Sequence, residues 1–444
     1  MRRLLLAGLL GFTFLGARQR VVKPAPLPPV AQAGPTFNKE VVRVFQDHCQ
    51  SCHHPGDIAP FSLMTYSDAL PYADSIKVMT KTHQMPPWKA TEGCGDFTDP
   101  RVLTGDEIDL ISKWVEHGAP EGNRADLPAP REFAGGWALG QPDMILSYPE
   151  AYTPPAAGDM YRCFPLPTNL ATDQYVSAID IKPGDAESVH HVIAYLDTTG
   201  ESLKMDANDP GPGYTSFGGP GFSITNIGAS TLGGWAPGAR PALLPETVAY
   251  SLPAKTNVVL QVHYHPHHGA PKPDVTRIGI YFAKKKPSKT MFMLPLINDK
   301  FVLPANDPDK KVTQSFTSPI AVHLWMVAPH MHLLGRTMHV QAKLPTGETK
   351  CLIDIKDWDF NWQGTYGYNQ PLAFPALTTV SLEAHYDNSA NNWRNPNSPP
   401  KEVRWGEQTT DEMCIAFLGV TIDSENLVSG LHANPDLLFK ALQQ

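Results

Sequence analysis

The amino-acid sequence lacks the signatures of several large classes of protein. It contains no dinucleotide-binding fingerprint, no P-loop and no nucleophile elbow, so none of the corresponding enzyme classes is indicated. It has no basic tract and its formal net charge is −8, so we expect no nucleic-acid partner. Beyond its first residues it has no apolar run near the roughly 20 residues that a membrane-spanning helix needs. We therefore expect no stable membrane insertion.

The first residues predict export. Arg2 and Arg3 precede the apolar run LLLAGLLGFTFLGA, which ends in small residues. About 14 apolar residues are too few to cross a bilayer, so the pattern predicts a signal peptide over residues 1–17, cleaved after Ala17, rather than a membrane anchor. Residues 18–35 are rich in proline and alanine and predict an extended linker. The protein is therefore expected to be periplasmic or secreted.

Long helical patterns are also scarce. The chain has 44 prolines, roughly twice the average usage, which argues against long helices and favours β-sandwiches. Beyond residue 140, short runs of β-branched and aromatic residues alternate with turn residues, as in an all-β region of two sandwiches. The predicted strands are YVSAIDI, HHVIAYL, VVLQVHYH, RIGIYFA, IAVHLWMVA, MHVQAKL, VSLEAHY and CIAFLGV.

Cysteine is sparse, with six residues, but two of them form a motif. Cys49, Cys52 and His53 make a C-x-x-C-H pattern in the stretch DHCQSCHHPG. In an exported chain this pattern predicts one covalently attached haem c, with His53 as the proximal ligand. Met85, in THQMPPWKA, is the preferred distal ligand, because a Met/His pair is typical of electron-transfer haems and two prolines stiffen the backbone. The competing distal ligands are His48, His54 and His83.

Two helical patterns surround this motif. Apolar residues from Phe37 to Phe45 lead into it, and LTGDEIDLISKWVEHGAP predicts a second helix that Thr104 and Glu107 begin with a capping box. We therefore predict a small all-α cytochrome c domain over residues 36–122, followed by a linker over residues 123–140.

Histidines gather in three places in the β region. Side chains two apart on a strand share a face, so His330 with His332, or His263 with His265, could clamp one metal. Adjacent His190 and His191 point opposite ways in a regular strand and could share a metal only at a strand end or an irregularity. Neutral imidazole suits copper, zinc and iron, and a thioether, here Met413, biases the choice to copper.

These segments resemble the motifs of the type II copper, ascorbate-dependent monooxygenases, which include peptidylglycine α-hydroxylating monooxygenase and dopamine β-monooxygenase. The similar segments fall in the family's order across roughly residues 140–435. They are HHVI at 190–193, GWAPGARP at 234–241, LQVHYH at 260–265, HMHLLGR at 330–336 and DEMC at 411–414.

The resemblance implies two jelly-roll β-sandwich domains, over residues 141–286 and 287–444, that face each other across an open cleft and hold one copper ion each. The family hydroxylates a substrate C–H bond with O2, and one copper supplies an electron to the other. By position, the electron-transfer copper would be held by His190, His191 and His263, and the catalytic copper by His330, His332 and Met413.

The sequence departs from the family in three ways. It carries its own haem motif, which could replace ascorbate as the source of electrons to the coppers. Ala328 and Phe417 stand where the peptide hydroxylase has an arginine that grips a carboxylate and a tyrosine, so a peptide C-terminus is not the expected substrate. The cysteines are fewer, and we expect Cys414 to be bridged, to Cys351 or Cys163. Histidines without an expected role are His265, His267, His268, His323, His339 and His385.

The leading hypothesis is an exported, haem- and copper-dependent monooxygenase that takes electrons from an external donor and hydroxylates a small organic substrate with O2. An alternative is a non-catalytic electron-transfer or copper-binding protein on the same scaffold. The sequence gives less support to a third hypothesis, a haem–cupredoxin fusion such as a nitrite reductase, because a type 1 copper site needs a cysteine thiolate with two histidines. No histidine closely follows Cys414.

Overall fold

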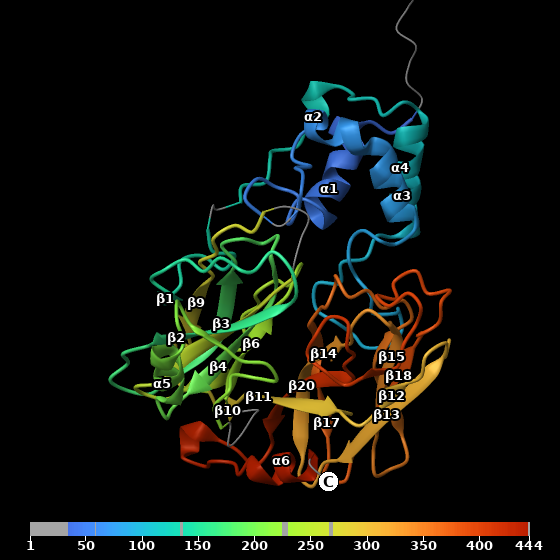
Figure 1. Cartoon of the computed structure of the whole chain (residues 1–444). Coiled ribbons are helices and arrows are strands. Elements are labelled where there is room, and N and C mark those ends of the chain that lie inside the picture. The colour runs from blue at the N-terminus through green and yellow to red at the C-terminus, as the bar shows by residue number, and fades with distance from the viewer. Residues whose placement is uncertain (1–33, 58, 134–135, 224–229, 266–269, 443–444) are drawn as a thin grey trace, which may run out of the picture. The chain divides into compact units, whose positions relative to one another are not determined.

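The protein is mostly β, with a few short helices, in a computed structural model that describes residues 34–442 except 58, 134–135, 224–229 and 266–269 (Figure 1). The predicted signal peptide, nearly all of the predicted first linker, and His267 and His268 lie outside these described residues. Within the described ranges, no helix is long and apolar enough to cross a membrane.

A helical region follows residue 35 and is coloured blue to cyan in Figure 1. It packs around Phe37, Phe45, Ile111 and Trp114, all nearly inaccessible to solvent. The predicted capping box is confirmed, because Glu107 N donates to Thr104 Oγ1 while Thr104 N donates to Glu107 Oε2. The elements are η1 (Phe37–Val41), α1 (Val42–His48), α2 (Tyr66–Ala69), η2 (Leu70–Tyr72), α3 (Ala73–Lys81), α4 (Gly105–Glu116) and η3 (Arg124–Asp126).

Two five-stranded sheets follow and enclose one apolar core; they are called the first sandwich here. One sheet has the order β1 (Met144–Ser147), β9 (Arg277–Phe282), β3 (Gln174–Lys182), β7 (Val248–Leu252) and β10 (Lys289–Thr290). The other has the order β5 (Tyr214–Thr215), β2 (Met160–Pro167), β8 (Asn257–Tyr264), β4 (Val189–Asp197) and β6 (Thr231–Trp235), with α5 (Glu201–Asn208) in a connection.

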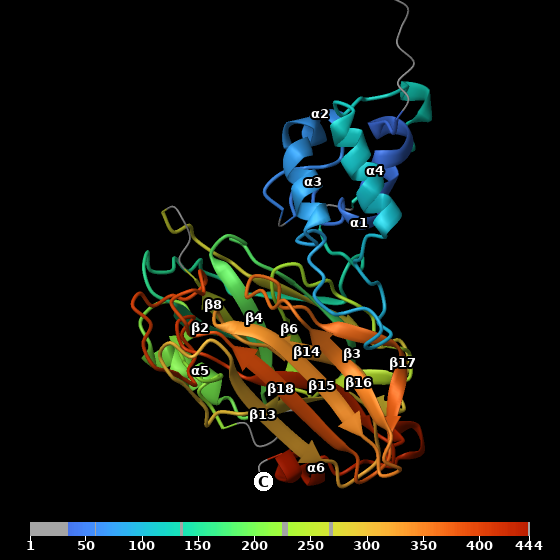
Figure 2. The ribbon, with the colours of Figure 1, turned by 90° about the vertical axis from the view of Figure 1, so that its right-hand side faces the viewer.

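Two four-stranded sheets form the second sandwich around a separate apolar core. One has the order β11 (Phe292–Ile297), β20 (Ile415–Ile422), β14 (Val322–His330) and β17 (Tyr366–Phe374). Figure 2 shows the other sheet, β13 (Lys310–Thr317), β18 (Thr379–Tyr386), β15 (Gly335–Lys343) and β16 (Thr349–Ile355). A short pair of strands and two helices complete it: β12 (Val302–Leu303), β19 (Val403–Arg404), η4 (Leu427–Ser429) and α6 (Asp436–Leu442).

All eight predicted strands are present, with ends shifted by no more than three residues. The alternation of buried and partly exposed residues explains this agreement: β18, for example, alternates strictly along its length. A run with period two can bury its apolar side chains against a core only as a strand.

The structure does not set the helices apart as a separate all-α domain. Residues 86–101, called the docking arm here, leave the helical region and pair with the second sandwich. Thr91 N donates to Asp354 O and Thr98 N to Gly367 O, both at 2.8 Å. Apolar side chains of the arm, among them Phe97, complete the core of the second sandwich. The helical region thus has an apolar core of its own but is tied to the second sandwich through the docking arm.

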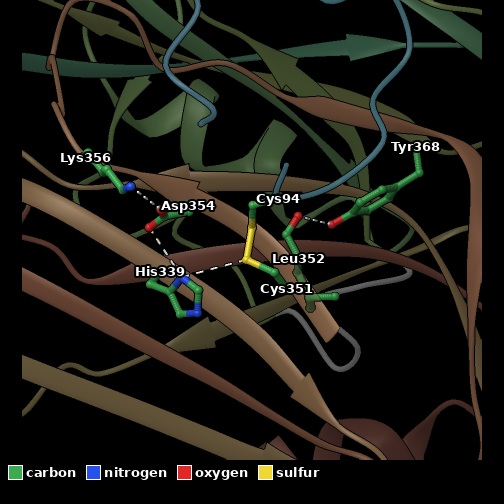
Figure 3. Close-up of a disulfide and its surroundings, with 7 residues drawn as sticks. All are labelled: Cys94, His339, Cys351, Leu352, Asp354, Lys356 and Tyr368. Atoms are coloured by element: carbon green, nitrogen blue, oxygen red, sulfur yellow. Dashed lines mark hydrogen bonds and ion pairs between the residues drawn. A yellow bond between two sulfur atoms is a disulfide. The ribbon is translucent and has the colours of Figure 1, made fainter. Parts of the chain in front are cut away.

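A disulfide joins the docking arm to β16 (Figure 3). It links Cys94 to Cys351, which are 257 residues apart in the sequence. The expectation that Cys414 is bridged is wrong: Cys414 and Cys163 are buried free cysteines. The physical reason is that Cys163 lies in β2 of the first sandwich, whereas Cys414 belongs to the core of the second.

Candidate metal centre

Three histidines of the first sandwich converge on one point. His191 and His263 are direct cross-strand partners on β4 and β8. The register shifts between Val189 and His191, and this bulge lets adjacent His190 and His191 approach the same point. One nitrogen from each of the three rings lies within 4.8 Å of the others. The irregularity that two adjacent histidines need in order to share a metal is therefore present.

Burial keeps these three imidazoles neutral. It lowers the pKa of His190 and of His191 well below the ordinary value, and the charges of the neighbouring histidines lower it further. Burial also lowers the pKa of His263, although Asp159 opposes the shift. His190 Nε2 is buried and has no hydrogen-bond partner among the described residues. Neutral rings with a buried, unpaired nitrogen suit a metal ligand set.

Asp159 supports this group, and sequence reasoning missed it. Its carboxylate accepts hydrogen bonds from His265 at 2.7 Å and from Thr409 N at 2.8 Å, and lies 3.3 Å from His263 Nε2. Burial alone would raise the pKa of Asp159, but the close approach of His263 and the hydrogen bonds from His265 and Thr409 outweigh it and hold the pKa below its usual range. Nothing in the sequence distinguishes Asp159, because it lies in a loop and its partners are distant along the chain.

The second group lies where β14 ends and β20 begins. His330 is the last residue of β14 and His332 follows the strand, so the expectation that both lie on one strand is wrong. Their ring centroids are still 5.3 Å apart. Met413 is buried two residues before Ile415, the cross-strand partner of His330. Burial lowers the pKa of His330 to about 4 and that of His332 to about 3.

Glu412 holds this second group together. It is fully buried, and its carboxylate accepts backbone hydrogen bonds from His332, Leu334 and Met413 at 2.8, 2.6 and 3.1 Å. His332 N and Met413 N donate to the same oxygen atom, Oε2. Burial raises the pKa of Glu412 to about 8, against the opposing effect of these N–H groups. Glu412 belongs to the DEMC segment, but the sequence does not indicate this role.

The two groups lie side by side rather than across an open cleft. The ring centroids of His191 and His330 are 6.2 Å apart. Phe360, from the second sandwich, stacks on His190 at 4.2 Å and meets His332 edge-on at 5.7 Å. Hydrogen bonds such as Asp159 to Thr409 N join the two sandwiches beside the histidines. Aromatic packing and these hydrogen bonds therefore bring the two sandwiches into contact at the histidines, where the resemblance implies an open cleft.

The cross-strand neighbours Ala328 and Phe417 lie on the strand face that His330 shares. They pair directly on β14 and β20, two residues before the pair formed by His330 and Ile415. Both side chains are half-buried. The surface beside His330 is therefore apolar at these two positions.

The C-x-x-C-H segment forms a compact turn after α1. His53 N donates to Cys49 O at 3.0 Å, and Cys49 and Cys52 are free rather than joined to each other. His53 Nδ1 pairs with Phe61 O at 3.0 Å, which leaves Nε2 available. Burial lowers the pKa of His53, although Phe61 O opposes the shift. Free thiols and a neutral, oriented imidazole fit the attachment of a haem.

The distal side of a haem is less defined. Met85 follows α3, is half-buried, and donates its backbone N–H to Met79 O. No hydrogen bond or ring contact between described residues joins Met85 to His53, so Met85 as the distal ligand stays a prediction. Two of the competitors have partners of their own, since His48 pairs with Glu107 and His54 stacks on Phe133. The third, His83, is exposed.

No protein-family model and no curated protein matches the chain. Solved structures match weakly. The major capsid protein P2 from bacteriophage PM2 is 10% identical, with 63% of this chain and 97% of that chain covered, at a TM-score of 0.25. The infectious bursal disease virus VP2 subviral particle is 10% identical over 67% and 82%, at 0.17, and PNGF-II is 9% identical over 63% and 65%, at 0.26. Scores this low carry no argument about fold or function.

Proposed function

We propose that the protein is an exported, haem- and copper-dependent monooxygenase that hydroxylates a C–H bond of a small organic substrate with O2. The observation that carries the proposal is the convergence of five histidines, three of them buried and two half-buried, beside a buried thioether. His190, His191 and His263 would hold one copper ion, and His330, His332 and Met413 the other. Copper supplies one-electron redox chemistry with O2 that zinc cannot supply.

The surroundings of the second group support an apolar substrate. Ala328 and Phe417 provide an apolar surface next to His330. Gln363 Oε1 lies 2.5 Å from His330 Nδ1 and accepts a hydrogen bond from it. This bond orients the ring and leaves Nε2 as the ligand atom. Glu412 holds the backbone of His332 and Met413, so these two ligands would be pre-positioned. A substrate with an apolar C–H group fits this environment better than a carboxylate.

The helical region would supply electrons. His53 and the free thiols of Cys49 and Cys52 fit one haem c, and Met85 remains the proposed distal ligand. The haem would accept electrons from an external donor and replace the ascorbate of the similar enzymes.

A second function is favoured by one specific observation. Phe360 occupies the space between His190 and His332, and the two groups lie in contact. This packing would suit a non-catalytic electron-transfer or copper-binding protein with little room for a substrate. A monooxygenase must open this packing to admit substrate.

The first test is copper stoichiometry, measured by elemental analysis and electron paramagnetic resonance. We expect two copper ions in the native chain and one in His263→Ala. His323→Ala is the matched control, because His323 pairs with Asp423 at the surface and should keep both ions.

The second test is reoxidation of the haem, reduced anaerobically, after O2 is added. Fast reoxidation only with copper and an intact Met413 supports a monooxygenase and calls for a substrate screen. Two bound copper ions with equal reoxidation in Met413→Ala would favour the electron-transfer alternative. Binding of no copper by the native chain would refute both functions.

A further inference from the structure

The C-x-x-C-H turn contacts the first sandwich through one arginine. Ser51 lies between Cys49 and Cys52, and the guanidinium group of Arg240 donates a hydrogen bond to Ser51 Oγ. Arg240 also forms an ion pair with Asp99 of the docking arm, at 3.1 Å. Arg240 therefore holds the turn that carries both thiols and the arm that leads away from it.

The same loop contacts the second sandwich two residues earlier. Gly238 O accepts a hydrogen bond from Arg101 Nη1 at 2.7 Å, and the ring of Trp362 lies against the backbone of Gly238. A Cβ atom at residue 238 would lie 3.3 Å from this ring, and the φ angle of +79° is one that glycine adopts without strain. Residues 238–240 thus join the helical region, the docking arm and the second sandwich.

The contacts continue from Trp362 to the candidate metal ligands. Trp362 precedes Gln363, whose amide nitrogen donates to Phe360 O at 2.9 Å and whose Oε1 lies 2.5 Å from His330 Nδ1. Ser51, residues 238–240, Trp362, Gln363 and His330 therefore form an unbroken series of covalent and non-covalent contacts. One alternative route, to His191, follows the backbone from Arg240 back to Trp235 on β6 and crosses to Val192 on β4.

We infer that Arg240, Gly238 and Trp362 are positioning residues that couple the C-x-x-C-H turn to His330, and that the series of contacts through them is the route for electrons within the chain. This inference rests on the proposed function. One electron leaves an iron(II) donor, which becomes iron(III), and reduces a copper(II) acceptor to copper(I), with no bond made or broken. The external donor restores the iron(II). The route delivers electrons to the His330 group directly rather than through the His190 group.

The test is laser-flash photoreduction of the haem in copper(II)-loaded protein, followed by the rate at which the haem is reoxidised without O2. We expect this rate to fall about tenfold in Arg240→Gln and in Trp362→Leu, equivalent to about 1.4 kcal/mol of barrier. Arg240→Lys and Trp362→Phe should retain most of the rate. Arg277→Gln is the control, because Arg277 is an exposed arginine on β9 of the same sandwich.

Two further measurements distinguish a variant with slower electron transfer from a variant with a damaged metal site. The copper resonance spectrum should stay unchanged in Arg240→Gln, since Arg240 touches none of the proposed copper ligands. Ascorbate-driven O2 consumption should also persist. If Trp362→Leu does not fold, Arg240→Gln and its lysine counterpart decide the question.

The outcomes distinguish the inference from the proposed function. Equal reoxidation rates in all variants, with ascorbate-driven O2 consumption intact, would overturn the route and leave the monooxygenase standing. Copper-independent reoxidation in the native protein would overturn the route and also the proposed supply of electrons from the haem to copper. Failure to bind copper would overturn both.

Discussion

The two histidine groups are built in different ways, although each would hold one metal ion. His190, His191 and His263 lie on neighbouring strands, and a bulge in β4 brings the adjacent pair together. Their placement follows from strand register. The second group has only His330 on a strand, while His332 and Met413 lie in segments outside β14 and β20. Its placement depends on a buried carboxylate, Glu412.

The two groups are therefore held in place by different interactions. The first is held by a sheet whose hydrogen bonds run along the full length of β4 and β8. Asp159 adds orientation at its edge. The second has the hydrogen bonds to one carboxylate as its principal support, so the loss of one side chain would release both His332 and Met413. The first group should therefore be robust, and the second sensitive, to substitution of a single supporting residue.

The largest expected effect is that of Glu412→Ala. Removal of the carboxylate leaves three buried N–H groups without acceptors, at about 1–3 kcal/mol each, so we expect a loss of at least about 3 kcal/mol in the free energy of unfolding. Urea unfolding measures the loss. In the folded fraction, copper bound at the second group should be lost while the first group keeps its ion.

Two variants sharpen this prediction. Glu412→Gln keeps an acceptor oxygen and should cost less than Glu412→Ala. Glu383→Ala removes an exposed glutamate of the same sandwich and should change stability by no more than about 0.5 kcal/mol. Loss of copper from both groups in Glu412→Ala would show that the two groups are not supported independently.

The same distinction explains what the sequence could predict. The strands follow from period-two burial, and the pairing of His191 with His263 follows from two strands that carry histidines near their ends. The sequence shows that adjacent His190 and His191 can share a metal only if the strand is irregular. It does not show that the irregularity is a bulge after Val189. The expected strand geometry for His330 and His332 is wrong because β14 ends between them.

Features that depend on contacts across the fold escaped sequence reasoning. Cys94 meets Cys351 only because the docking arm pairs with β16 and β17, and no local pattern predicts that pairing. Asp159 and Glu412 owe their roles to neighbours distant along the chain. Burial of an acidic side chain is decided by tertiary structure, so residue type alone suggests an exposed position.

An intermediate effect is expected for Asp159→Ala. Asp159 faces His263 and His265, and loss of such a supporting carboxylate typically weakens metal binding by about 10–100-fold. Copper affinity at the first group should fall by this factor, as measured by competition with a chelator, while the second group should change little. Asp143→Ala, which removes an exposed carboxylate paired with Lys284, is the control. An equal loss at both groups would show that Asp159 acts through the contact with Thr409 instead.

The smallest effect concerns a histidine outside both groups. His385 is partly exposed, and although burial lowers its pKa, hydrogen bonds to Asp309 and Glu383 outweigh this and raise it. Because the folded chain binds this proton more tightly, the stabilisation is complete below the unfolded pKa of about 6.5 and is lost as pH rises through the higher folded pKa. His385→Gln should therefore cost about 0.5 kcal/mol at acid pH and nothing at alkaline pH, because exposed ion pairs are weak. Urea unfolding at the two pH values measures this difference. Both copper ions should remain bound, since an imidazole held in its charged form is not a ligand, and loss of an ion would mean that the two groups are wrongly assigned.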